Sequence, residues 1–156
     1  MRYLGLDQAL QTSGWAVFED DKLIAQDSFT TSSKNTIGNR LWQLFEHLTS
    51  LYEEYNFQMV FFEDIQNQQS IATYCKLAYV QAIVLLWCTC NNVEYNLLAP
   101  SHWRKIIGGN FGNRREAQKA YAIQKVKELY GITVGSDAAD AILIGKAGYD
   151  EFINAN

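Results

Sequence analysis

Residues 2–31 read RYLGLDQALQTSGWAVFEDDKLIAQDSFTT, and this opening stretch has the pattern of a series of short strands. Its first six residues alternate in character and end in an acid, Asp7. Two more strand-like runs follow, residues 14–18 and 23–31, with the turn-like Glu19-Asp20-Asp21 between them. Short apolar runs bounded by polar turns are typical of β-strands. The stretch therefore predicts three short strands joined as consecutive antiparallel hairpins.

Helical periodicity dominates the rest of the chain. Apolar residues recur every three or four positions over residues 36–55, which predicts a helix there. The apolar run at 57–62, which ends at Glu63-Asp64, suits a buried strand, and residues 93–98 predict another. Further helices are expected over residues 70–90, 100–107, 114–130 and 136–153, with a flexible loop over 108–113. This order predicts an α/β fold, a mixed sheet with helices on its faces.

The expected helix over residues 70–90 is apolar around more than one face. Such a helix packs on two sides, which predicts a second partner and favours another copy of the chain. The alternative is a core helix that is wholly intramolecular. We expect Cys88 and Cys90 to be buried free thiols, and His47, which falls off the apolar stripe of its own helix, to be exposed.

Length and composition exclude several classes of protein. The 156 residues, 48% of them hydrophobic and one of them proline, predict a single globular domain over residues 1–156. The longest apolar stretch, Leu77–Cys90, is interrupted by Gln81 and is shorter than the roughly 18–20 residues of a membrane span. An acid at Asp7 also argues against a secretory signal. We expect a cytoplasmic protein, and three cysteines with two histidines predict neither a disulfide framework nor a zinc site.

Charge is distributed unevenly along the chain. The formal net charge is −4, yet residues 101–128 hold seven basic and two acidic side chains. A basic segment on an acidic body is typical of a surface that binds phosphates. The alternative is a solvated helical face.

Four carboxylates stand at positions where chemistry is expected: Asp7 and Glu63 at strand ends, and Asp137 and Asp140 in one short segment. Residues three apart share a helical face, and neighbouring parallel strands end at the same edge of a sheet, where α/β folds usually place their sites. Crowded carboxylates repel one another unless cations are present. Oxygen ligands suit Mg²⁺ or Mn²⁺, which predicts metal-assisted phosphodiester hydrolysis.

Each acid also has an ordinary structural explanation. An acid at a strand end is often a turn residue, Asp137 could stabilise a helix N-terminus, and Asp140 could lie on the surface. Asp64 competes with Glu63 for the strand-end role, because successive strand residues point to opposite faces.

The motifs together resemble the RuvC-type Holliday-junction resolvases, most closely their bacteriophage-encoded members. The resemblance implies a ribonuclease-H-like fold with three antiparallel strands followed by two parallel ones. It also implies a homodimer that makes paired, Mg²⁺- or Mn²⁺-dependent nicks in four-way DNA junctions and leaves 5′-phosphate and 3′-hydroxyl ends. The motifs that carry it are Gly5-Leu6-Asp7, Ser13-Gly14-Trp15-Ala16, Phe62-Glu63, Ala99-Pro100, Lys105, Gly108-Gly109, Ala117-Gln118-Lys119 and Asp137-Ala138-Ala139-Asp140-Ala141.

Roles for individual residues follow from the resemblance. Asp7, Glu63, Asp137 and Asp140 match the four acidic metal ligands of the family. Lys105 and Lys119 match its DNA-contacting or catalytic lysines, and Arg115 lies one helical turn before Lys119. With Arg104 and Arg114, these basic side chains are expected to hold DNA phosphates.

Aromatic residues bear on the expected DNA contacts. The family carries an aromatic residue shortly after the glutamate, whereas residues 65–69 here are Ile-Gln-Asn-Gln-Gln, so no sequence preference for cleavage is predicted. We expect the four tryptophans, Trp15, Trp42, Trp87 and Trp103, to be mostly core, although Trp103 could contact DNA beside Arg104.

Three other functions remain open from the sequence. An actin-like or sugar-kinase ATPase also begins with a glycine-bearing strand and an acid, but it needs two related domains and further phosphate loops. A junction-binding protein that does not cleave, and a ribonuclease-H-like nuclease acting on RNA or flaps, would share this scaffold.

Overall fold

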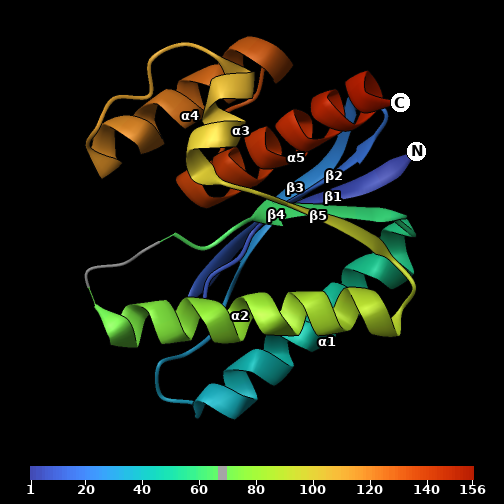
Figure 1. The fold of residues 1–156 in the computed structure, drawn as a ribbon, viewed down its shortest axis with the longest axis vertical. Helices are drawn as coiled ribbons and strands as arrows, with labels where there is room; N and C mark the ends of the chain where they lie inside the picture. The colour runs from blue at the N-terminus through green and yellow to red at the C-terminus, as the bar shows by residue number, and fades with distance from the viewer. Residues whose placement is uncertain (67–69) are drawn as a thin grey trace.

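The computed structural model describes residues 1–66 and 70–156, which form a five-stranded mixed sheet between two layers of helices (Figure 1). The strand order is β3-β2-β1-β4-β5. Strands β1 to β3 are antiparallel, whereas β4 and β5 run parallel to β1. The predicted mixed sheet is therefore confirmed. The strands are β1 (Arg2–Asp7), β2 (Thr12–Glu19), β3 (Lys22–Thr30), β4 (Met59–Glu63) and β5 (Glu94–Leu98).

Helices cover both faces of this sheet, α1 and α2 on one face and α3, α4 and α5 on the other (Figure 1). Thr36 caps α1 by accepting a hydrogen bond from the N–H of Asn39, and Pro100 begins α3 at the position where its missing N–H costs nothing. The predicted helices are all present. They are α1 (Ile37–Tyr55), α2 (Ile71–Cys90), α3 (Pro100–Ile107), α4 (Arg115–Tyr130) and α5 (Ser136–Ala155).

Alternation along β1 divides the core into two clusters. Leu4 and Leu6 face α1 and α2, whereas Tyr3 faces the α5 layer. Helix α5 is buried on nearly every side between Ala138 and Gly148, where Asp140 and Lys146 alone are not fully buried.

Two glycines let α5 lie directly on the strands. A Cβ at Gly5 would collide with the backbone of Ala141 and Gly145, and one at Gly14 would collide with the peptide of Asp137. The first turns of α5 therefore sit backbone to backbone on β1 and β2, which fixes the position of every side chain that leaves these turns.

Helix α2 has one buried and one exposed face. Val80, Val84 and Trp87 are fully buried against α1 and the sheet, whereas Ile71 is 83% and Leu86 53% exposed. The helix is therefore not a core helix that the monomer covers on every side. Among the described residues, α2 is also the one helix whose length and mean hydropathy, 1.5, would suit a membrane span; here its buried face belongs to the core.

Three expectations for single residues were wrong. His47 is partly buried, because its ring stacks on Phe29 of β3 with centroids 4.2 Å apart. Trp42 is 57% exposed and stacks on Phe45 along the outer side of α1. Cys88 is buried as expected, but Cys90 is exposed because it lies on the outward face of α2.

Candidate active site

The sheet brings Asp7 and Glu63 to one edge. Strands β1 and β4 are parallel neighbours whose last paired residues are Leu6 and Phe62. Asp7 and Glu63 are the next residue of each strand, so both carboxylates leave the sheet at the carboxyl end of adjacent strands. This edge is where α/β sheets usually bind their ligands.

Helix α5 adds two more carboxylates to the same place. Asp7 pairs with Gly14 across the β1–β2 ladder, and Gly14 lies against the peptide of Asp137. Asp140 follows almost one helical turn later and shares that face of α5. The four predicted acids thus come from three separate parts of the chain to one end of the sheet.

The four acids act on one another electrostatically. Burial raises the pKa of Asp7 well above its usual value, and the charges of Asp140, Glu63 and Asp137 raise it further. Burial and the charge of Glu63 raise the pKa of Asp140 to about 7. Without a cation, burial and mutual repulsion thus both disfavour the ionised forms of Asp7 and Asp140.

Glu63, rather than Asp64, is the strand-end acid that belongs to this cluster. Glu63 raises the pKa of both Asp7 and Asp140. Burial raises the pKa of Glu63 itself, while the hydrogen bond from Trp103 and the charge of Arg104 lower it. Asp64 and Glu63 both line a small cavity beside Leu77 of α2 and Pro100. The effect of Glu63 on the pKa values of Asp7 and Asp140 is what favours it over its neighbour.

Three cations face the acids. Arg115 lowers the pKa of Asp7, and Arg104 and Lys119 lower that of Asp140. Arg104 reaches the cluster from α3, where its guanidinium lies 5.0 Å from the centre of the Trp103 ring and 5.9 Å from that of Phe111. The other predicted DNA-binding residues, Lys105 and Arg114, are exposed and lie on the outer side of the same basic segment.

Two side chains that sequence reasoning missed hold Glu63 in place. Trp103 is fully buried, which confirms the expectation that it lies in the core and rules out the alternative that it contacts DNA. Its indole Nε1 donates a hydrogen bond to Glu63 Oε2 over 2.7 Å. Gln8 Nε2 donates to the main-chain oxygen of Glu63 over 2.6 Å. No local pattern reveals either bond, because each joins residues 40 or more positions apart.

The backbone beyond Glu63 is also held. The N–H of Asp64 donates to the carbonyl of Leu98, and the N–H of Ile65 donates to Gln81 Oε1 of α2 over 3.2 Å. The polar segment that stands where the family has an aromatic residue continues into residues 67–69, which lie outside the described residues.

The donor set fits a hard divalent cation, although it does not form a finished cage. Over residues 1–66 and 70–156, no three Asp, Glu, His or Cys side chains converge closely enough to hold a metal ion as they stand. Carboxylate oxygens in this number suit Mg²⁺ or Mn²⁺ rather than a thiol-preferring metal.

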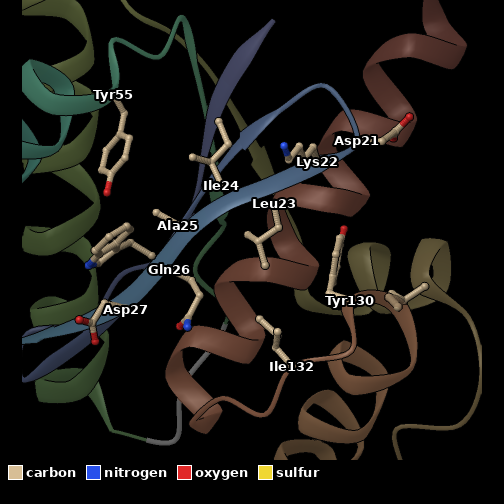
Figure 2. Close-up of a pocket in the computed structure, with 12 residues that line it drawn as sticks. Asp21, Lys22, Leu23, Ile24, Ala25, Gln26, Asp27, Tyr55, Tyr130 and Ile132 are labelled. Carbon is tan, nitrogen blue, oxygen red and sulfur yellow. The ribbon is translucent and has the colours of Figure 1, made fainter.

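A cavity of about 970 Å³ lies elsewhere, along the edge strand β3 (Figure 2). Residues 21–27 form its floor, with Tyr55 of α1 on one side and Tyr130 and Ile132 on the other (Figure 2). None of the four clustered acids lines it. This cavity is therefore separate from the candidate active site.

The chain matches one known protein family over most of its length. The family model of the crossover junction endodeoxyribonuclease RuvC matches residues 3–146. The chain belongs to the RuvC family. The resemblance expected from the sequence motifs is confirmed, and the match includes all four clustered acids and the basic segment.

Curated relatives agree with this membership over nearly the full length. The crossover junction endodeoxyribonuclease RuvC of Dictyoglomus thermophilum is 28% identical over 148 residues, which cover 92% of this chain and 93% of the relative. The RuvC of Rickettsia akari is 29% identical over 148 residues, with 92% and 94% covered.

Solved structures show the same fold. Thermus thermophilus RuvC in complex with a Holliday junction substrate superposes with a TM-score of 0.81 at 14% identity, covering 98% of this chain and 96% of that one. The Fowlpox virus resolvase in complex with Holliday junction DNA gives a TM-score of 0.65 at 16% identity, with 98% and 99% covered. The expected fold of this family is confirmed.

Proposed function

We propose that this chain is a structure-selective endodeoxyribonuclease that resolves four-way DNA junctions, and acts on other branched DNA, by metal-dependent paired nicking. Each nick leaves a 5′-phosphate and a 3′-hydroxyl. The single observation that carries the proposal is the gathering of Asp7, Glu63, Asp137 and Asp140 at one end of the sheet with three cations facing them. Membership of the RuvC family and the junction-bound structural neighbours support the substrate class.

The acids would hold the metal. We assign Asp7, Glu63, Asp137 and Asp140 as ligands of Mg²⁺, for which Mn²⁺ can substitute. Bound there, the metal would activate a water and stabilise the departing oxygen of the phosphodiester. The chain itself supplies rigidity, because α5 rests backbone to backbone on β1 and β2, and supplies the negative field that concentrates a divalent cation at this edge.

The basic segment would hold DNA. Lys119 faces Asp140, so it is assigned both a catalytic and a DNA-binding role, and Arg104, Lys105, Arg114 and Arg115 are assigned to phosphates. Exposed Lys105 and Arg114 lie at the outer part of this surface, whereas Arg104 and Arg115 lie close enough to the acids to affect their pKa values. A phosphate held between cations and acids would lie beside the attacking water. Binding by such contacts weakens steeply with salt.

A second copy of the chain would supply the paired cut. The outward face of α2 exposes Ile71, Tyr74, Tyr79 and Leu86, a set of large apolar side chains that the monomer leaves uncovered. Contiguous apolar surface of this kind marks an interface with another protein. A homodimer through α2 would carry two acid clusters and cleave two strands of one junction.

We place this activity in the cytoplasm, where chromosomal DNA is found in bacteria, or in the cytoplasm of the host cell if a phage encodes the chain. Similarity to bacterial RuvC proteins supports the cytoplasmic location. The resemblance to phage-encoded members stays a prediction.

The deciding experiment is incubation with a synthetic mobile four-way junction and Mg²⁺, with the products resolved by strand. We expect symmetric nicks in two strands of like polarity, and Asp7→Asn should abolish cutting while junction binding persists, because the cations that grip phosphates remain. Three-way, flap, linear and RNA-containing duplexes serve as comparison substrates. Binding without cleavage would indicate a non-cleaving junction-binding protein, and preferred cleavage of flaps or RNA would indicate a different nuclease of this fold.

A further inference from the structure

Trp103 places a single hydrogen-bond donor on the carboxylate of Glu63. The indole is fully buried in the α5-side core, and its Nε1 lies 2.7 Å from Glu63 Oε2. An indole N–H can donate but cannot accept, so Oε2 is held as an acceptor. The other oxygen of Glu63 receives no such bond from Trp103 and is left for a different partner.

The surrounding residues allow the indole one orientation. Glu63 pairs with Leu98 across the β4–β5 ladder, and α3 begins two residues later at Pro100, which sets Trp103 above the end of β4. Phe111 packs edge-on against the indole, with centroids 5.6 Å apart and planes at 88°. The Arg104 guanidinium covers the same ring. The N–H direction is therefore fixed by the packing of Phe111 and Arg104 against the ring and by the hydrogen bond to Glu63.

We propose that Trp103 is a positioning residue that orients the Glu63 carboxylate for the divalent metal. This inference rests on the proposed function, in which Glu63 is a metal ligand. Partners that hydrogen-bond a ligating side chain fix its orientation, and their loss typically weakens metal binding about 10- to 100-fold. Trp103 acts through Glu63 and touches neither the metal nor DNA.

A purely structural role is the competing explanation, because a buried indole N–H needs an acceptor wherever it lies. The chain offers a matched control for that role. Trp87 of α2 is equally buried, and its Nε1 donates to Thr49 Oγ1 over 3.0 Å on the opposite side of the sheet. Replacing either tryptophan by phenylalanine removes one N–H donor and keeps an aromatic ring in the core.

The test compares Trp103→Phe with Trp87→Phe in the full chain. The first measurement, made without DNA, is the rise in melting temperature when Mg²⁺ is added. A ligand that binds only the folded state raises the melting temperature, and a tighter ligand raises it further. The second is the Mg²⁺ concentration that half-saturates junction cleavage. The third is junction affinity in EDTA, which reports the DNA surface alone.

We expect Trp103→Phe to raise the half-saturating Mg²⁺ concentration at least about tenfold and to reduce the Mg²⁺-induced rise in melting temperature, with junction affinity in EDTA unchanged. Trp87→Phe should lower the melting temperature but leave the Mg²⁺ response as in the wild type. Equal Mg²⁺ responses in both variants, or a normal one in Trp103→Phe, would overturn the proposal.

A double variant separates action through Glu63 from a general disturbance. In a Glu63→Ala background, Trp103→Phe should produce no further loss of the Mg²⁺-induced stabilisation, because the side chain that Trp103 orients is gone. An additive loss would overturn the proposal. The melting measurements need no cleavage, so a protein that binds junctions without cutting them would refute the proposed function and still report on Trp103.

Discussion

Gly14 of β2 and Asp137 of α5 touch backbone to backbone, with no room for a Cβ between them. This contact, one strand away from Asp7, sets the height of α5 above the sheet and hence the separation of the four carboxylates. The small residue is required by the close approach and not by an unusual backbone angle, because no left-handed conformation occurs at this position.

Gly14→Ala should therefore displace the first turn of α5 and uncouple the acids. Overpacking of this kind typically destabilises a protein by about 1–3 kcal/mol, and cleavage should fall by more than the unfolded fraction explains, because the ligand geometry is lost in molecules that remain folded. Urea unfolding and junction cleavage measure the two effects.

Gly38→Ala is the matched control, because a Cβ at Gly38 of α1 would meet nothing within 4 Å. Alanine is favoured over glycine in helices by about 0.5–1 kcal/mol, so this variant should be at least as stable as the wild type and fully active. A Gly14→Ala protein with wild-type cleavage would contradict the role given to the close contact.

Neighbouring acids at the end of β4 make a second pair for comparison. Glu63→Gln should abolish cleavage, because the side chain that faces Asp7 and Asp140 loses its charge, whereas Asp64→Asn should retain most of it. The measurement is the single-turnover cleavage rate at saturating Mg²⁺, with junction binding as a control for folding. If Asp64→Asn were the inactive variant, the assignment of the two residues would be reversed.

Local sequence pattern predicted most of the fold, because the periodicity of apolar residues within each segment is enough to identify a strand or a helix. The meander at residues 2–31 and the helices follow from periodicity, and the strand-end positions of Asp7 and Glu63 follow from where apolar runs stop. The three-residue spacing of Asp137 and Asp140 predicted that they share a helical face, and the motif resemblance assigned both of them as metal ligands. Those assignments needed no knowledge of which residues touch across the sheet.

Contacts between distant segments could not be predicted in this way. The bond from Trp103 to Glu63 depends on α3 folding back over β4, and a tryptophan beside two basic residues suggested DNA contact instead. Trp42 was expected in the core because aromatic residues usually are, but it lies outside the buried face of α1, which Leu44, Leu48 and Leu51 form. His47 was expected to be exposed because it falls off the apolar stripe of α1. It is partly buried instead, because it stacks on Phe29 of the edge strand β3, a contact between distant parts of the chain.

Adjacent basic residues on α3 provide a third prediction. Arg104 lowers the pKa of Glu63 and Asp140, whereas Lys105 is exposed on the outer side of the helix. Arg104→Ala should reduce the cleavage rate by an order of magnitude or more, and Lys105→Ala should mainly weaken binding and lessen its salt dependence by about one counterion. Cleavage rates at saturating protein and salt titrations of binding distinguish them. A larger rate loss in Lys105→Ala would contradict the placement of Arg104.

The raised pKa values of the acids predict how stability depends on pH in the absence of metal. Burial and Glu63 raise the pKa of Asp140 to about 7. A carboxyl that binds its proton more tightly in the folded chain stabilises the fold below its ordinary pKa, near 3.8, and that contribution is lost as pH rises through about 7. The ionised Asp140 carboxylate is then held in a site that favours its protonated form.

Asp140→Asn should remove this dependence. In EDTA the variant should be more stable than the wild type at about pH 8, and the difference should shrink towards about pH 5, where Asp140 is protonated in the folded wild type. Urea unfolding across this range measures it. A difference that grows as pH falls would show that Asp140 is stabilised as an anion and would contradict its raised pKa.

The outward face of α2 provides the last prediction, which concerns assembly. Leu86 is 53% exposed on the outward apolar face of α2, and a charge there would have to be buried without a partner if two copies met through α2. Leu86→Glu should therefore give a monomer in analytical ultracentrifugation and convert paired cuts into single, uncoordinated nicks, while each acid cluster stays intact. Leu129→Glu, at a similarly exposed leucine of α4, should leave a dimer. A dimeric Leu86→Glu protein that still makes paired cuts would place the interface on another surface.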